Sequence, residues 1–353
     1  MNNDNARILK NLIFGLAGFT VLIGVGYLIY SWNRPINPAL NLPTEKQVVE
    51  ITDGTDEPQI SVTEEVSITP TPTIEPVCGA PPSLNILVSG VASNSYLYGL
   101  ADAVRVVRID FQTKEVAVLA LPRDLWVRIP GLESRGIEAG KLNQAYFYGT
   151  EGMGYYSGAG FGSGLLAETL LLNYDYRADR YLAVNLNSFR IIIDALGGID
   201  VYLNQPVYKK VNEQPKIFLT AGSHHLNGKE AEMLARHRIT IGDLGRIENQ
   251  TVVLKAVAVK LLSPSGIVAI PALVEQLKSN VETDLSPADI SQLICLAGML
   301  DYQEDIHFET VPSEFMNEQM VHDPARGINT AALVGNEAEI RNLIADYLRG
   351  IWP

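Results

Sequence analysis

Strand-forming residues dominate the stretch 85–121, NILVSGVASNSYLYGLADAVRVVRIDFQTKEVAVLAL. Three apolar segments stand out within it, at residues 85–91, 104–110 and 116–121, and a polar turn at residues 112–115 separates the last two. Aliphatic and β-branched runs bounded by polar turns are typical of neighbouring strands. The stretch therefore predicts a sheet that begins with successive strands.

Helical segments alternate with further strands after residue 160. Helical character extends over residues 163–172, 187–196, 227–236 and 243–262, with strand-like runs at 181–184 and 199–203. Strands mixed with helices of this length predict an α/β domain in which helices cover a mixed β-sheet. We expect the domain over residues 78–262, and we expect residues 263–353, which show no separate motif, to elaborate it.

An uncharged segment near the N-terminus predicts a transmembrane anchor. Residues 11–33 carry no charge, are long enough for a helix to cross the hydrocarbon core, and end in aromatic residues suited to a membrane interface. Arg7 and Lys10 precede the span and Arg34 follows it, which favours a cytoplasmic tail at residues 1–10. The chain is therefore predicted to be a single-pass protein of the cell membrane whose C-terminal domain is extracytoplasmic.

Residues 34–77 have the composition of a disordered linker. From residue 41 to residue 77 there are eight acidic residues and one lysine, together with a Pro-Thr repeat at residues 69–73. Such a segment buries no core. We expect it to hold the folded domain away from the outer face of the membrane.

The charge of the chain is unevenly distributed. The formal net charge is −13, whereas residues 78–274 carry 19 basic and 17 acidic residues and are nearly neutral. An acidic chain is unsuited to general nucleic-acid binding, so no nucleic-acid partner is expected. The arginines of the nearly neutral region must act locally.

The chain contains two cysteines, Cys78 and Cys295. Two cysteines are too few for a zinc site, and their separation in sequence does not reveal the distance between their Cα atoms. A disulfide suits the predicted extracytoplasmic location. A disulfide and a pair of free thiols both stay open.

Three arginines gather around a predicted helix start in the segment LARHRITIGDLGRIENQ, residues 234–250. Arg236 and Arg238 lie at the end of one helix, and Arg246 and Gln250 lie on one face of the next. A guanidinium binds phosphate through parallel hydrogen bonds, and a helix N-terminus favours anions. The segment predicts a phosphate or pyrophosphate site.

Two other motifs place polar side chains after predicted strands, and a glycine-rich segment lies between helices. Arg123 follows a strand directly, where open α/β sheets commonly bind ligands, and Lys141 offers an ammonium group; each alone also fits a surface turn. Residues 149–164 contain seven glycines and three aromatic residues. This segment predicts a mobile loop that could act as a lid.

Nine short motifs run in series along the chain: Asn85-Ile-Leu-Val-Ser-Gly90, Ala101-Asp102, Leu121-Pro-Arg-Asp124, Ile129-Pro-Gly131, Lys141-Leu-Asn143, Asp194-Ala-Leu-Gly-Gly-Ile199, Leu226-Asn-Gly228, Ala235-Arg-His-Arg238 and Asp243-Leu-Gly-Arg246. In this order they resemble the LytR-CpsA-Psr family, also called the cell envelope-related transcriptional attenuator domain, over about residues 84–262. The anchor, linker and outward-facing domain also resemble the arrangement of that family.

The resemblance implies an enzyme that binds a polyprenyl-pyrophosphate-linked glycan with its lipid tail in an apolar tunnel. Such an enzyme would transfer the phosphoglycosyl polymer to a cell-wall acceptor, usually peptidoglycan, with Mg²⁺ or Mn²⁺ assisting. Cleavage of a pyrophosphate depends on positioning and charge neutralisation, which arginines and a metal ion can supply.

The resemblance also assigns roles to single residues. Pyrophosphate binding falls on Arg123, Lys141, Arg236, Arg238, Arg246 and Gln250, and catalysis on Asp102, Arg123, Arg236 and Arg238. Asp102 would be a metal ligand or a carboxylate that orients the base. His237, which lies between two of the arginines, is expected to be structural rather than catalytic.

Three positions depart from the pattern of the family. The metal-binding Asp after the first strand falls at Ala92, an Arg before the second Asp falls at Leu100, and an Arg before Gln250 falls at Asn249. Loss of one carboxylate halves the anionic ligand set for a hard cation. Two alternatives stay open: Asp124 or water molecules replace the missing carboxylate, or the chain is a non-catalytic protein that binds polyprenyl-pyrophosphate glycan with a degenerate metal site. A transcriptional regulator is disfavoured, because the sequence offers no basic reading helix.

Overall fold

The computed structural model describes residues 32–42, 74–211, 214–237, 242–278 and 280–351. The predicted cytoplasmic tail at 1–10 and nearly all of the predicted anchor at 11–33 lie outside these ranges. Within the described ranges, no single helix has the length and hydropathy needed to cross a membrane. The two helices Gly245–Leu262 and Pro264–Gln276 meet that test only as a pair, which is bent by 98°.

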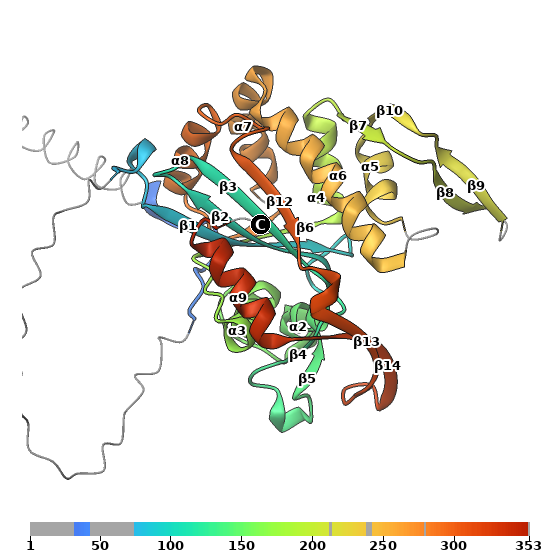
Figure 1. Ribbon diagram of the computed structural model, residues 1–353. Coiled ribbons are helices and arrows are strands. Elements are labelled where there is room, and N and C mark those ends of the chain that lie inside the picture. The colour runs from blue at the N-terminus through green and yellow to red at the C-terminus, as the bar shows by residue number, and fades with distance from the viewer. Residues whose placement is uncertain (1–31, 43–73, 212–213, 238–241, 279, 352–353) are drawn as a thin grey trace, which may run out of the picture.

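A six-stranded mixed sheet forms the centre of the domain (Figure 1). Its order is β11 (Glu282–Thr283), β6 (Arg180–Asn185), β1 (Ser83–Val91), β2 (Ala101–Asp110), β3 (Glu115–Leu121) and β12 (Ile306–Thr310). The three successive strands expected from the sequence, β1, β2 and β3, are antiparallel neighbours, and β6 and β12 extend the sheet in parallel with β1 and β3. The predicted mixed α/β fold is confirmed. The part of the chain after residue 263 supplies both β11 and β12.

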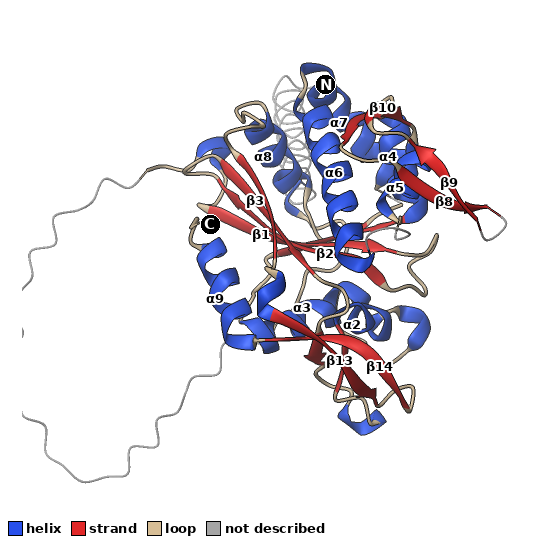
Figure 2. Cartoon of the chain, turned by 45° about the vertical axis from the view of Figure 1, so that its right-hand side comes forward, coloured by secondary structure: helices blue, strands red, loops and turns tan. Residues whose placement is uncertain are grey.

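Helices cover the two faces of the sheet (Figures 1 and 2). On one face lie α2 (Leu142–Gly149), α3 (Phe161–Tyr174) and α9 (Glu337–Leu348), and on the other lie α4 (Leu186–Ala195), α5 (Gly228–Ala235), α6 (Gly242–Leu262), α7 (Pro264–Leu277) and α8 (Pro287–Ala297). Side chains alternate between the faces along β2. Val104 and Val106 are buried in the core with α2, α3 and α9, whereas Arg105 meets Gln250 of α6 on the opposite face.

Two-stranded antiparallel sheets surround the central sheet. Their strands are β4 (Trp126–Arg128) with β5 (Ala139–Lys141), β7 (Ile199–Leu203) with β10 (Gly222–Leu226), β8 (Val207–Val211) with β9 (Gln214–Leu219), and β13 (Met316–Asp323) with β14 (Ile328–Gly335). Single 3₁₀ turns lie at η1 (Val77–Gly79), η2 (Glu133–Arg135), η3 (Glu151–Met153) and η4 (Ser313–Phe315).

The glycine-rich segment 149–164 is packed, so the prediction of a mobile loop is wrong. A Cβ atom at Gly149 would lie 2.8 Å from the Cβ atom of Leu165, and one at Gly162 would lie 2.8 Å from the ring of Tyr146. These glycines let α2 and α3 approach closely. The glycines here permit close helix packing. Composition alone does not distinguish this role of glycine from backbone mobility.

The aromatic side chains of the same segment are also packed. Tyr155 stacks on Tyr148 with ring centroids 6.3 Å apart, and the hydroxyl of Tyr156 donates to Oε1 of Glu168 at 2.7 Å. Aromatic stacking and a hydrogen bond to a helix fix the segment against α2 and α3. It forms a wall of the domain.

A disulfide joins Cys78 in η1 to Cys295 in α8, with their Cα atoms 5.9 Å apart. Of the two possibilities that the sequence left open, the structure contains the bonded pair. The bond links the entry to β1 with a helix from the C-terminal part, across a sequence separation of 217 residues.

A strap formed by residues 34–42 packs at the edge of the sheet beside β11. The backbone N–H groups of Ile36 and Asn37 donate to the carbonyl oxygens of Leu285 and Thr283 at 3.3 and 3.0 Å. These bonds satisfy part of an otherwise open sheet edge.

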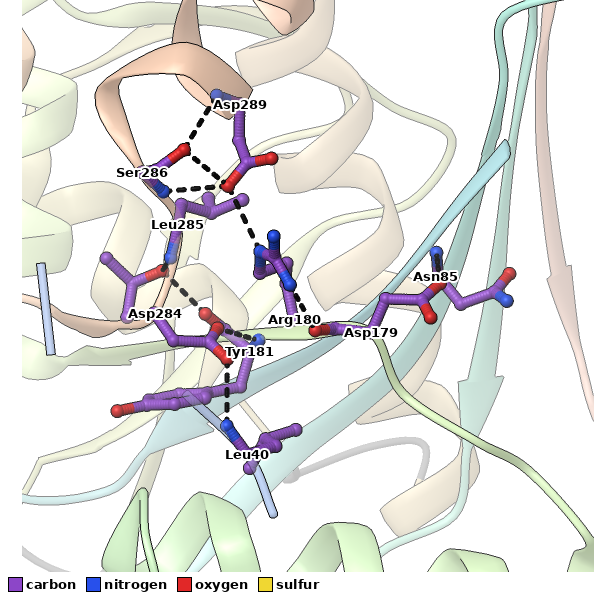
Figure 3. A network of polar contacts seen from close by, with 10 residues as sticks. Leu40, Asn85, Asp179, Arg180, Tyr181, Asp284, Leu285, Ser286 and Asp289 are labelled. Atoms are coloured by element: carbon purple, nitrogen blue, oxygen red, sulfur yellow. Dashed lines mark hydrogen bonds and ion pairs between the residues drawn. The ribbon is translucent and has the colours of Figure 1, made fainter. Parts of the chain in front are cut away.

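Asp284 holds the strap from the domain side (Figure 3). Its fully buried carboxylate accepts hydrogen bonds from the backbone N–H of Leu40 at 3.2 Å and of Tyr181 at 2.7 Å. One carboxylate thereby joins the strap to β6.

The strap corrects the predicted boundaries of the linker. Residues 34–42 and 74–77 are part of the packed structure rather than a disordered segment, and residues 43–73 lie outside the described ranges. The physical reason is composition. All eight acidic residues of the predicted linker lie at position 45 or later, whereas the strap brings Leu40 and Leu42 to the main core.

The partly buried carboxyl group of Glu282 in β11 should make the free energy of unfolding depend on pH. Burial raises the pKa of its carboxyl group to about 7; the nearby Tyr146 hydroxyl lowers the pKa in part, and Glu151 raises it further. The folded state therefore keeps a proton that the unfolded state has lost, so the free energy of unfolding falls as pH rises from about 4.5 to about 7. Glu282→Gln should remove this fall.

At pH 8 we expect Glu282→Gln to be more stable than the wild type by about 1–2 kcal/mol, a value that allows for solvent screening of a partly exposed carboxylate. At pH 4.5 the two proteins should be equally stable, because the wild-type carboxyl is then protonated in the folded state. Thermal unfolding across this pH range measures the difference. Parallel stability curves for the two proteins would contradict the assignment.

Candidate functional site

An ion-paired cluster forms where β2, the end of β3 and α6 meet. Asp102, the second residue of β2, lies at its centre. Its Oδ1 atom is 2.6 Å from Nη1 of Arg123, and its Oδ2 atom is 3.5 Å from Nη1 of Arg246. One carboxylate thus positions two guanidinium groups that come from segments more than 100 residues apart in the sequence.

The β4–β5 hairpin brings Lys141 to the same cluster. Lys141 pairs with Trp126 across the hairpin, and the N–H of Asn143 donates to the carbonyl oxygen of Arg123 at 3.0 Å. Asp124 then bridges Nε of Arg123 at 3.3 Å and Nζ of Lys141 at 2.9 Å. Two motifs that are weak individually therefore belong to one site.

Helix α6 contributes Arg246 and Gln250 from its buried face. Arg246 lies in the first turns of the helix, where N–H groups and the helix dipole favour anions, and is only 1% exposed. Gln250, four residues later, donates from Nε2 to the carbonyl oxygen of Asp102 at 3.3 Å. The two side chains lie together as their helical spacing predicts.

Arg105 is a member of the cluster that the sequence did not reveal. It projects from the middle of β2 with only 3% of its surface exposed, and its Nη2 donates to Oε1 of Gln250 at 3.1 Å. Burial lowers its pKa to about 10, and the neighbouring charge of Arg246 adds to this effect. The available signal was a charged residue, Arg105, between valines in a predicted strand. A strand with one buried and one solvated face shows the same alternation of apolar and charged residues.

The described contacts of Arg236 lie outside the cluster. Its side chain is 57% exposed and its Nη1 atom lies 2.8 Å from Oε1 of Glu232, whose Oε2 is 3.2 Å from Nη1 of Arg190. Arg190 in turn donates to Oδ1 of Asn94 at 2.6 Å. The sequence did not single out Arg190, since a single arginine in an amphipathic helix has no distinguishing spacing.

The structure therefore brings together five of the predicted site residues: Asp102, Arg123, Lys141, Arg246 and Gln250. Arg236 follows α5, which packs against α6, and Arg238 lies outside the described residues. His237 is buried, and burial lowers the pKa of its imidazole. The lowered pKa favours the neutral imidazole, and the structural role of His237 stays a prediction.

A cavity of about 540 Å³ opens beside the cluster. Its lining combines the polar side chains Arg123, Asp124, Lys141, Asn143 and Gln144 with Leu100, Ile137, Phe147, Tyr148, Met153 and Tyr155, and with Ala325 and Arg326 of the β13–β14 turn. A lining that combines cationic groups with aliphatic and aromatic groups suits a ligand with an anionic head and an apolar or ring-shaped body. The C-terminal part thus completes a site whose charged residues come from earlier in the chain.

The residues present do not fit the divalent metal that the family resemblance implies. Ala92 offers no ligand, and the Asp102 carboxylate is already held by Arg123 and Arg246. Among the described residues there is no group of three or more His, Cys, Asp or Glu side chains that could hold a metal ion. Hard cations such as Mg²⁺ require several oxygen ligands, whereas the two carboxylates of the cluster, Asp102 and Asp124, are already engaged by Arg123, Lys141 and Arg246.

A sequence model of the LytR-CpsA-Psr family matches residues 46–340 of the chain. The chain is 32% identical over 191 residues to the polyisoprenyl-teichoic acid–peptidoglycan teichoic acid transferase TagV of Bacillus subtilis, covering 53% of this chain and 45% of TagV. It is 27% identical over 266 residues to the regulatory protein MsrR of Staphylococcus aureus, covering 75% and 74%. The matched segment therefore spans less than half of TagV and about three quarters of MsrR.

Solved structures share the fold. The crystal structure of B. subtilis TagV aligns with a TM-score of 0.60 and 25% identity, covering 76% of this chain and 97% of that one. A LytR-Csp2A-Psr enzyme from Actinomyces oris aligns with a TM-score of 0.56 and 21% identity, covering 75% and 89%. At this level of identity, the second likeness concerns the fold alone.

Proposed function

The chain belongs to the LytR-CpsA-Psr family, and from this membership we propose that it transfers a glycopolymer from a polyprenyl-pyrophosphate carrier to a cell-wall acceptor such as peptidoglycan. The name of TagV, a polyisoprenyl-teichoic acid–peptidoglycan teichoic acid transferase, supports this reaction class. In the proposed reaction, an acceptor hydroxyl displaces polyprenyl phosphate at the phosphorus that carries the glycan.

The excess of positive charge in the cluster is the observation that carries the proposal. Among the described side chains, Arg105, Arg123, Lys141 and Arg246 face two carboxylates, Asp102 and Asp124. A pyrophosphate diester brings about two negative charges, which would balance this excess in a partly buried site.

The geometry supports assigned roles for the cluster. Arg123, Lys141 and Arg246 would hold the pyrophosphate and stabilise the charge on the departing phosphate, with Asp102 and Asp124 fixing their positions and Gln250 in support. Arg236, whose side chain is 57% exposed, would meet the substrate where it enters or leaves. A contact with the substrate is also proposed for Arg238.

We also propose the location and the partners. The charge-free segment at residues 11–33 would anchor the chain in the cell membrane with the domain outside, where the lipid-linked glycan and peptidoglycan are available. The strap that follows this segment would then hold the domain within a few residues of the anchor, closer to the membrane than a 44-residue linker at positions 34–77 would place it.

A transfer assay tests the proposal. The full-length chain in detergent micelles is incubated with a polyprenyl-pyrophosphate-linked glycan, labelled in the sugar, and with purified peptidoglycan. We expect polyprenyl phosphate to be released and the label to become covalently attached to peptidoglycan. Retention of intact lipid without release would indicate the alternative function, a non-catalytic carrier-binding protein. Absence of both release and binding would refute the proposal.

A further inference from the structure

Arg105 is a buried cation whose hydrogen-bond acceptors among the described residues are all neutral. Its Nη2 atom donates to the amide oxygen of Gln250 at 3.1 Å, and its Nη1 atom donates to the carbonyl oxygen of Val104 at 3.1 Å. Among the described carboxylates, none forms an ion pair with it, and the neighbouring charge of Arg246 is also positive. Burying a charge in such surroundings is costly unless a counter-charge is supplied.

Arg108, three residues later on the same strand, differs from Arg105 in having a counter-charge. Arg108 pairs with the carboxylate of Asp110 at 2.7 Å, and so its charge is balanced within the protein. The two arginines share a strand and a residue type and differ in their counter-charge. The cost of burying Arg105 therefore requires an explanation outside the requirements of the fold.

Arg105 also orients a residue of the site. Gln250 uses its oxygen to accept from Arg105 and its Nε2 to donate to the carbonyl oxygen of Asp102. Strand β2 thus holds the amide at both ends, with the Gln250 oxygen on the Arg105 guanidinium and the Gln250 nitrogen on the backbone of Asp102. A positive charge is thus placed directly behind the group of anion-binding residues.

The same cluster is poor in metal ligands. Ala92 stands where the family pattern has a carboxylate, so one metal ligand is missing. Asn249 stands where the pattern has an arginine, so one positive charge is missing as well. We propose that Arg105 supplies the fixed positive charge that balances the bound pyrophosphate, so that this chain binds its lipid carrier without a divalent metal. This inference rests on the proposed function and specifies how that site neutralises its ligand.

Binding measurements on the full-length chain in detergent test the proposal with geranylgeranyl pyrophosphate as the probe. The wild type should bind the probe with the same affinity, within about twofold, in EDTA and in Mg²⁺. Geranylgeraniol serves as the control for the tail alone. Binding that appears only with Mg²⁺ would overturn the metal-independent site while leaving the proposed function in place. Absence of specific pyrophosphate binding in both conditions would remove the proposed function as well.

Two substitutions test the role of Arg105 itself. Arg105→Met should weaken binding of the probe by about 10- to 50-fold, because it removes a buried charge of the right sign beside the anion. Arg105→Lys should recover part of that loss, since it keeps the charge and loses the planar fork. Unchanged affinity in Arg105→Met would overturn the proposal.

Stability separates this role from a structural one. Without ligand, Arg105→Met should melt at the wild-type temperature or above it, because removing an uncompensated buried charge is neutral or stabilising. The matched control, Arg108→Met, loses an ion pair within the protein and should leave probe binding unchanged. A lower melting temperature of ligand-free Arg105→Met, with affinity unchanged, would show that the residue serves the fold alone.

Discussion

Arg246→Met should weaken binding of a polyprenyl pyrophosphate by about 100-fold or more and should reduce transfer at least as strongly. The substitution takes a buried positive charge out of the anion site and leaves the Asp102 carboxylate with one cation fewer, so the site becomes less favourable for an anion. Arg246 is 1% exposed and lies beside Asp102, so no solvent-exposed side chain can replace it. Equilibrium binding of a labelled lipid pyrophosphate measures the effect.

The control is the exposed arginine of the same predicted cluster. Arg236→Met should cost no more than about tenfold, because its side chain is 57% exposed and it already pairs with Glu232. Arg246→Lys should lie between Arg246→Met and the wild type, since an ammonium keeps the charge without the fork of donors. A larger loss of affinity in Arg236→Met than in Arg246→Met would show that the anion binds near Arg236 rather than in the cluster.

Loss of the disulfide should have the largest effect on stability. The double variant Cys78→Ser with Cys295→Ser should lose about 3–5 kcal/mol of unfolding free energy, because the bond closes a long loop and so restricts the unfolded chain. For a domain of this size, that loss corresponds to a fall in melting temperature on the order of 10 °C. Thermal unfolding of the two proteins under oxidising conditions measures it.

Reduction of the wild type provides the internal control for the disulfide. The chain has two cysteines, so a reductant should lower the wild-type melting temperature to that of the double variant and leave the variant unchanged. If the wild type and the double variant melt within about 2 °C of each other without reductant, the bond does not restrain the domain.

The elements of the fold were predictable because their signals are local. The strands in residues 85–121 and the long helix starting near Asp243 come from apolar patterns that each element carries within its own sequence. The α6 helix places Arg246 and Gln250 together for the same reason, since helical spacing is fixed by the backbone.

Two predictions were wrong, those for segments 149–164 and 34–42, because the composition of each segment fits two different structures. Glycines between residues 149 and 164 fit a mobile loop or close helix packing, and the structure has close packing between α2 and α3. The strap at 34–42, which contains no acidic residue, was included with its acidic neighbours, although it docks beside β11 through hydrogen bonds to Thr283 and Leu285. In both cases the deciding partner lies elsewhere in the chain.

The sequence by itself determined the fold class, the family and most of the cationic residues of the site. Strand and helix patterns, motif order and residue type can all be determined from the order of residues along the chain. Only the tertiary structure decided which charges meet. Asp102 pairs with Arg123 and Arg246, and the buried Arg105 lies behind them with neutral acceptors. Electrostatic balance depends on distance and burial between residues remote in sequence, and these quantities exist only after the sheet and α6 have packed together.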